Sequence, residues 1–186
     1  RTLGINGIHA SAVSAECYIS NGLPAFDIVG LPDAAVKEAR ERIVKALGFK
    51  NTDGTLIFTA SGTESDNMAV RGAVKTNARK GKHIVITDVE HPAVESTVSE
   101  LEKEGCTVSR IPTKGGVLDM EFAEKAMTKD TVLVSCMTIN NETGAIFDVA
   151  GLKRLASRLC PDAYFHTDAV QAFTKVKSFA MTGADM

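Results

Sequence analysis

The chain has 186 residues, of which 44% are hydrophobic and 24% charged, and its formal net charge is −2. This composition is typical of a globular protein with one ordinary domain or slightly more, and it argues against a disordered chain. The small net charge indicates no nucleic-acid partner, and no apolar run approaches the roughly 20 residues of a membrane span. We therefore expect neither nucleic-acid binding nor membrane association.

The four cysteines are widely separated and form no CxxC pair; they are Cys17, Cys106, Cys136 and Cys160. This spacing argues against a metal site and against a disulfide framework, so we expect buried thiols in a reducing, cytoplasmic protein. The chain begins with Arg1 rather than methionine, and residues 182–186 resemble the middle of a domain. We expect both ends to lie inside a longer sequence.

The first predicted elements are a β-hairpin and a helix. Residues 12–19 alternate between apolar and polar, as a half-buried strand does, and a turn signal at 20–22 precedes a second strand through 26–29. Asp33 is a good N-cap for a helix over residues 34–47, and Gly48 follows as a helix-ending glycine.

From residue 55 onward, short apolar strands alternate with amphipathic helices. The predicted strands are 55–59, 83–87, 107–111, 131–137 and 164–167, and the predicted helices are 64–78, 92–104, about 120–128, and 148–159. This alternation predicts an α/β fold, in which a parallel sheet with flanking helices follows the N-terminal hairpin and helix.

The junction from Phe58 to Asn67 combines a strand end, small hydroxyl residues and a helix start. A helix N-terminus presents unpaired backbone N–H groups and binds anions, phosphate above all. An ordinary helix cap uses the same residue types, so both interpretations stay open on this stretch alone.

Polar residues also follow the other predicted strands, at Glu90-His91, Asn140-Asn141-Glu142 and Asp168 to Gln171. Each has a structural interpretation: His91 as a helix-start residue, Asn140-Asn141 as a turn and Asp168 as a cap. The carboxyl ends of parallel strands meet at one edge of a sheet, where ligands bind. Their joint placement favours a binding site over four separate turns.

Four segments resemble the cysteine desulfurases, which are pyridoxal-phosphate (PLP) enzymes of the class V aminotransferase type. The segments are Ser61-Gly62-Thr63-Glu64-Ser65-Asp66-Asn67, Glu90-His91-Pro92-Ala93-Val94, Asn140-Asn141-Glu142-Thr143-Gly144 and His166-Thr167-Asp168-Ala169-Val170-Gln171. The resemblance extends from about residue 40 to residue 186 and implies part of the large domain of a PLP-dependent transferase.

The resemblance also implies a role for each site residue. Asp168 would pair with the pyridinium nitrogen of the cofactor, while His91 would lie on the ring face and act as the catalytic proton carrier. The other implied cofactor-binding residues are Gly62 and Thr63 at the phosphate, and Asn141 and Gln171 at the phenolic oxygen.

The family's reaction converts L-cysteine to L-alanine and passes the sulfur to an enzyme cysteine, for iron–sulfur cluster or thio-cofactor assembly. The implied partners are L-cysteine, sulfur-acceptor or scaffold proteins, and a second copy in a homodimer. In the family the lysine that carries the cofactor and the sulfur-accepting cysteine come later than the segment ending at Met186. We therefore expect this chain to be inactive by itself.

Residues 3–43 resemble a different family, the YifB/ComM-type ATPases related to magnesium chelatase. The matching strings are Gly4-Ile5-Asn6-Gly7 and the run from Asn21 to Glu38, which contains Gly-Leu-Pro-Ala-Phe and Val-Gly-Leu-Pro-Asp. We therefore divide the chain into residues 1–43 and 44–186, with a junction within 37–48. No Walker A motif occurs, which argues against ATP hydrolysis. Two alternatives to a cysteine desulfurase fragment therefore stay open: a non-catalytic chimeric α/β polypeptide and a chelatase-related protein.

Overall fold

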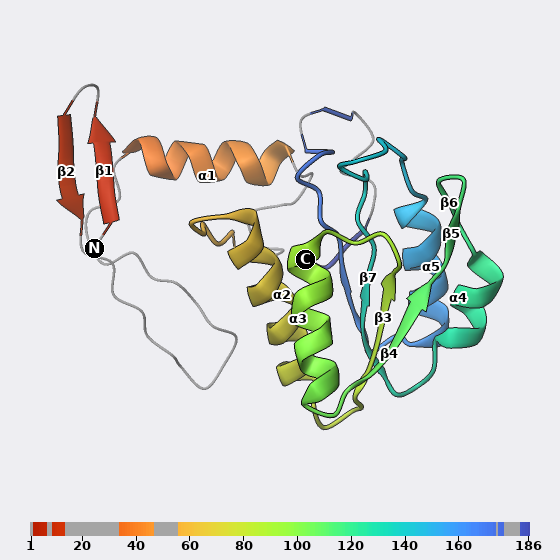
Figure 1. The fold of residues 1–186 in the computed structure, drawn as a ribbon. Coiled ribbons are helices and arrows are strands. Elements are labelled where there is room, and N and C mark those ends of the chain that lie inside the picture. The colour runs from red at the N-terminus through yellow and green to blue at the C-terminus, as the bar shows by residue number, and fades with distance from the viewer. Residues whose placement is uncertain (1, 7–8, 14–33, 47–55, 174, 177–182) are drawn as a thin grey trace. The chain divides into compact units, whose positions relative to one another are not determined.

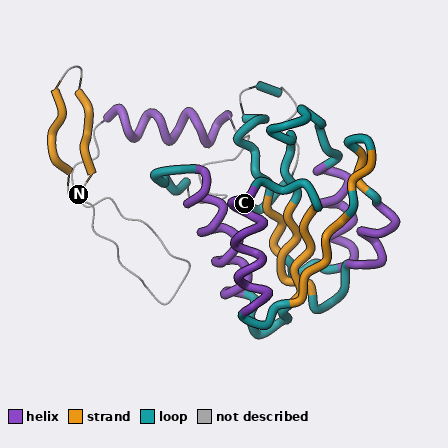
Figure 2. The backbone as a smooth tube through the Cα atoms, in the orientation of Figure 1, coloured by secondary structure: helices purple, strands orange, loops and turns teal. Residues whose placement is uncertain are grey.

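The computed structural model describes residues 2–6, 9–13, 34–46, 56–173, 175–176 and 183–186. The chain divides into two compact units, Arg1–Phe58 and Thr59–Met186, and each is described here by itself. Figure 2 shows the main strands of the second unit side by side in one sheet, with a small separate hairpin beside it.

The first unit contains a β-hairpin and a helix. Strand β1 (Thr2–Asn6) pairs antiparallel with β2 (His9–Val13), with Thr2 opposite Val13. Helix α1 (Ala34–Ala46) agrees closely with the helix predicted over 34–47. The hairpin predicted from 12–19 and 26–29 lies outside the described residues, apart from residues 12 and 13 in β2.

The second unit is built on a four-stranded sheet with the order β4-β3-β7-β8. All three neighbouring pairs are parallel. The strands are β3 (His83–Thr87), β4 (Thr107–Ile111), β7 (Thr131–Ser135) and β8 (Tyr164–His166). This parallel sheet with its helices confirms the predicted fold class.

Helices cover both faces of this sheet (Figure 1). Helices α2 (Gly62–Thr76) and α3 (Pro92–Lys103) lie on one face, and α4 (Met120–Ala126) and α5 (Val149–Leu159) lie on the other. Along β3, Ile84 and Ile86 pack into the apolar cluster beneath α2 and α3, whereas Val85 packs into the cluster beneath α4 and α5. Burial on both faces explains why the sequences of β3 and β7 are nearly continuous apolar runs.

The β1–β2 hairpin was not predicted, and two further local features differ from the sequence prediction. Residues 56–59, predicted as part of a strand, have no regular secondary structure. A small hairpin of β5 (Thr113–Lys114) and β6 (Val117–Leu118) was not predicted. Gly115 and Gly116 join its strands with positive φ angles of 60° and 79°, which suit glycine. Among the described helices, none is both long enough and apolar enough to cross a bilayer.

Candidate functional site

A cavity of about 280 Å³ lies at the carboxyl edge of the sheet, where a parallel sheet normally binds its ligands. It is lined by Gly62, Thr63, Asp66, His91, Met137, Ile139, Asn141, Asp168, Val170 and Gln171. All the site residues predicted from the sequence are in this set. The structure therefore gathers around one cavity residues that are more than 100 positions apart in the chain.

One end of the cavity is the start of α2. Ser61 is the N-cap, and its hydroxyl accepts a hydrogen bond from the Glu64 N–H at 3.2 Å. Glu64 in turn accepts from the Ala60 N–H at 2.7 Å, which makes a near-reciprocal capping arrangement. Gly62 and Thr63 occupy the first two helical positions, whose N–H groups have no acceptor within the helix. The segment at the start of α2 is therefore an ordinary helix cap, and the backbone N–H groups of Gly62 and Thr63 remain available to an anion.

Hydrogen bonds of Thr59, Ser65 and Asn67 hold the start of α2 in place. The hydroxyls of Thr59 and Ser65 lie 2.6 Å apart. Asn67 donates from Nδ2 to the Thr63 carbonyl at 2.7 Å and accepts from the Thr97 hydroxyl of α3 at 2.6 Å. These bonds fix the first turn of α2 against α3, so the donors at the cavity are held in position before any ligand arrives.

His91 lies at the start of α3, as its N-cap. Its Nδ1 accepts a hydrogen bond from the Ala93 N–H at 3.1 Å. A neutral His91 ring therefore carries its proton on Nε2. The cap interpretation and the site interpretation of this residue are compatible, because Nδ1 serves the helix while the side chain lines the cavity.

Glu90 ties two strand ends together beneath His91. Its Oε1 accepts from the Thr87 hydroxyl at 2.7 Å and from the Met137 N–H at 3.0 Å. Its Oε2 is buried and has no hydrogen-bond partner among the described residues. Burial raises the pKa of the Glu90 carboxyl, and the nearby Asp168 raises it further, against the lowering effect of these hydrogen bonds and of His166. From the sequence, Glu90 was recognisable only as part of the segment that contains His91.

The two adjacent asparagines of the loop after β7 differ in role. Asn140 is buried, and its Oδ1 accepts from the backbone N–H groups of Glu142 and Thr143 at 3.1 and 2.8 Å. Its Nδ2 donates to the Val89 carbonyl at 3.2 Å. Asn140 therefore builds the turn that was its structural interpretation, whereas the exposed Asn141 lines the cavity.

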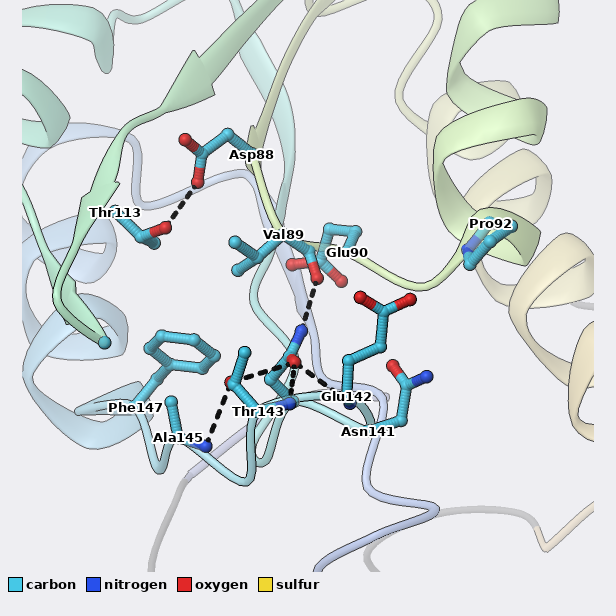
Figure 3. A pocket seen from close by; sticks show the side chains of 12 residues that line it. Asp88, Val89, Glu90, Pro92, Thr113, Asn141, Glu142, Thr143, Ala145 and Phe147 are labelled. Carbon is cyan, nitrogen blue, oxygen red and sulfur yellow. Dashed lines mark hydrogen bonds between the residues drawn. The ribbon is translucent and has the colours of Figure 1, made fainter.

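A second pocket, of about 340 Å³, adjoins the first and shares Asn141 with it. Figure 3 shows Glu142 and Asn141 on the loop after β7, and Asp88 close to Thr113, which donates from its hydroxyl to Asp88 Oδ1 at 2.8 Å. Its acidic side chains distinguish this pocket from the helix-start end of the cavity.

Asp168 and Gln171 enter the cavity from the segment after β8. Asp168 is 9% exposed, and its Oδ1 accepts from the Val170 N–H at 2.9 Å. This bond orients the carboxylate and leaves its other oxygen available to a ligand. The side-chain oxygen of Gln171, Oε1, accepts a hydrogen bond from Nζ of Lys175 at 2.8 Å, so the side-chain NH₂ group remains a donor.

Two buried polar side chains to which the sequence assigned no role, Asp66 and His166, lie close to each other. Asp66, on α2, is 6% exposed and lines the cavity. Its Oδ1 lies 3.6 Å from Nε2 of His166, and the other ring nitrogen of His166 lies 2.9 Å from the Ser135 hydroxyl. Asp66 sits within the segment that carries the predicted anion site, and His166 is two residues before Asp168. Their positions inside these two motifs were the only features of the sequence that could have pointed to a role for Asp66 and His166.

Asp66, His91 and Asp168 each place one ligand atom within 4.8 Å of the others, a spacing that could hold a metal ion. The sequence predicted no metal site, and that stays a prediction. The thiols are elsewhere. Cys136 and Cys160 are buried, Cys106 is partly buried, and Cys17 lies outside the described residues. Burial raises the pKa of Cys136 and brings that of Cys160 to about 11, so both are protonated at neutral pH.

The cavity residues fit a phosphorylated aromatic cofactor such as PLP. Backbone donors at a helix start suit a phosphate, and a buried carboxylate suits a protonated ring nitrogen. Both features line the same cavity, together with an imidazole and two amide side chains. Its volume of about 280 Å³ is near the lower end of small-molecule sites, roughly 300 Å³.

This fold and cavity define an α/β protein with a candidate small-molecule site at the carboxyl edge of its sheet. The family model for aminotransferase class-V matches residues 29–186, and the chain belongs to that family. Cysteine desulfurase IscS of Dictyoglomus turgidum is 45% identical over 138 residues, which is 74% of this chain and 34% of the relative. The chain thus spans about a third of the length of the curated relatives it matches.

Two solved structures show the same similarity. DndA from Streptomyces lividans matches with a TM-score of 0.71 and 33% identity, covering 80% of this chain and 41% of that one. SspA, solved in complex with cysteine, matches with a TM-score of 0.68 and 32% identity, covering 79% of this chain and 42% of that one.

Proposed function

We propose that residues 44–186 form the cofactor-binding part of a PLP-dependent cysteine desulfurase. The observation that carries the proposal is the single cavity that gathers residues from α2, from the start of α3 and from the segments after β7 and β8. The similarity of the chain to cysteine desulfurases supports the same assignment.

Each cavity residue has a task that its surroundings suit. The N–H groups of Gly62 and Thr63 would hold the cofactor phosphate, and Asp168 would hold the proton on the ring nitrogen. His91 would pack on the ring and carry a proton on Nε2, since its Nδ1 is occupied by the Ala93 N–H. Asn141 and Gln171 would donate to the phenolic oxygen. When bound, PLP supplies an electron sink for chemistry at the substrate carbon.

The proposed substrate of the whole protein is L-cysteine, which would leave as L-alanine after its sulfur passes to an enzyme cysteine. The curated relatives carry the name cysteine desulfurase, and SspA was solved with cysteine. We further propose a cytoplasmic homodimer that passes sulfur to an acceptor or scaffold protein for iron–sulfur cluster or thio-cofactor assembly.

By itself, the chain would bind PLP reversibly and release no sulfide. None of the described residues that line the cavity is a lysine, and none is a cysteine. A covalent anchor for the cofactor and a thiol to accept sulfur would come from elsewhere in the protein. We propose that residues 1–43 take no part in the cofactor site, and we keep their chelatase-related origin as a separate proposal.

The test is direct measurement of PLP binding by the 186-residue chain, by equilibrium dialysis and by the absorbance of the bound cofactor. We expect saturable binding that Asp168→Asn weakens by about tenfold or more, since a charge-assisted hydrogen bond contributes about 1.5–3 kcal/mol. Asp162→Asn, which removes a surface charge paired with Lys80, is the matched control and should change nothing. Absence of saturable PLP binding would refute the proposed function.

A further inference from the structure

Two carboxylates, rather than one, stand at the buried end of the cavity. Asp66 and Asp168 are 6% and 9% exposed, they line the same cavity, and their oxygens lie within 4.8 Å of each other. They come from different elements, Asp66 from α2 and Asp168 from the segment after β8. Like charges this close and this poorly hydrated repel each other, so the arrangement calls for a cation nearby.

Protein groups meet this need only in part. Nε2 of His166 lies 3.6 Å from Asp66, which is beyond hydrogen-bond distance, and its Nδ1 is engaged with Ser135. A ring nitrogen of His91 lies within 4.8 Å of both carboxylates, which also exceeds hydrogen-bond distance at that limit, and His91 Nδ1 accepts from the Ala93 N–H. Asp168 has one oxygen bonded to the Val170 N–H, which is neutral. The side of the pair that faces the cavity is therefore left for a positively charged ligand group.

We propose that Asp66 is a positioning residue of the ring-nitrogen subsite, and that with Asp168 it selects a heteroaromatic ligand carrying a proton on its ring nitrogen. Asp168 is the direct partner of that N–H. Asp66, which α2 places there, adds a second negative charge beside it and disfavours a neutral ring. This inference rests on the proposed function, because it takes the ligand to be a PLP-type ring.

The placement of Asp66 on α2 also links the two ends of the cavity. Asp66 lies one turn beyond Gly62 and Thr63 on the same helix, whose first turn is fixed by the Ser61 cap. The distance from phosphate donors to the second carboxylate is thus set within one rigid element. A ligand with a phosphate at one end and a ring N–H at the other matches both.

The experiment compares two ligands on the full 186-residue chain: PLP, and an analogue of PLP in which C–H replaces the ring nitrogen. The wild-type chain should prefer PLP by about tenfold or more, as expected for a charge-assisted hydrogen bond. Asp66→Asn keeps the shape of the side chain and should reduce that preference by about threefold to tenfold, through the lost charge. Asp162→Asn, remote from the cavity, should leave the preference unchanged.

The measured quantity is the ratio of the affinities of one protein for PLP and for the analogue. A moderate loss of stability in the variant lowers both affinities equally and therefore leaves this ratio unchanged. Competition by inorganic phosphate provides a second measurement, which Asp66→Asn should leave intact because the donors of Gly62 and Thr63 are untouched. If Asp66→Asn retains the wild-type preference while PLP still binds, the inference is wrong and the proposed function stands. Equal binding of PLP and the analogue to the wild-type chain also overturns it, and absence of PLP binding overturns both.

Discussion

The two ends of the cavity are built by different means. At the proposed phosphate end, Gly62 and Thr63 are exposed and offer backbone N–H groups from one continuous segment. At the proposed ring-nitrogen end, Asp66, Asp168 and His166 are buried and bring side chains from separate elements. Backbone donors depend on helix geometry, whereas the buried end depends on the identity and charge of particular side chains.

This difference predicts how each end fails. Loss of a side chain at the phosphate end leaves the donors in place, so only a change that removes an N–H or disturbs the helix start should weaken binding. Loss of a buried charge at the other end changes which ring is accepted, because uncompensated charge is costly where water is excluded. Variants can therefore separate affinity for phosphate from selectivity for the ring.

The largest effect is expected from Gly62→Pro. Proline suits the first position of a helix and lacks an N–H, so it removes one phosphate donor without interrupting α2. The preceding Ser61 has φ −159° and ψ 162°, the extended conformation that a following proline requires. We expect PLP affinity to fall by about tenfold to a hundredfold, the range for a charge-assisted hydrogen bond, with unchanged helix content by circular dichroism.

Gly62→Ala is the matched control, because it adds a side chain and keeps the N–H. A Cβ at this position would lie 3.5 Å from Cγ2 of Val170, an ordinary van der Waals contact. PLP affinity of the alanine variant should remain within about twofold of wild type. Equal losses for proline and alanine would mean that the cavity wall, rather than the N–H, holds the ligand.

A smaller effect is expected from Ser61→Ala, which removes the cap but no phosphate donor. Loss of the bond from Glu64 N–H to the Ser61 hydroxyl should reduce the free energy of unfolding by about 1 kcal/mol. PLP affinity should fall less than in Gly62→Pro. Urea unfolding measures the stability and PLP titration measures the affinity. The Ser61→Thr variant keeps a capping hydroxyl, so both its stability and its affinity should match those of the wild-type chain. A larger affinity loss than in the proline variant would contradict the backbone account of this end.

The difference between the two ends of the cavity also explains which parts of the site could be predicted from the sequence. The helix-start segment and the residues after each strand were predictable, because turn and cap residues next to apolar runs mark the carboxyl edge of a parallel sheet. The roles of Asp66 and Glu90 were not predictable from that pattern. They depend on contacts across long sequence separations, such as Asp66 with His166 and Glu90 with the Met137 N–H. Residues 56–59 were predicted as a strand because the pattern of apolar residues reports spacing along the chain and does not by itself fix the backbone conformation.

The smallest effect is expected at Glu90, a third carboxyl near the buried end. Burial raises the pKa of Glu90 above its ordinary value of 4.5, so the folded chain holds this proton more tightly than the unfolded chain does. The stability that follows is fully present below pH 4.5 and is lost as the pH rises through the folded pKa. Glu90→Gln cannot titrate, so its stability should lack this decline.

Relative to wild type, Glu90→Gln should therefore gain stability as the pH rises from 4.5 to 7, while the two proteins differ least at the acid limit. The amide oxygen can still accept from the Thr87 hydroxyl and the Met137 N–H, so the strand ends stay tied. Urea unfolding of both proteins at several pH values measures the difference. A difference that is constant with pH would mean that folding does not raise the pKa of Glu90.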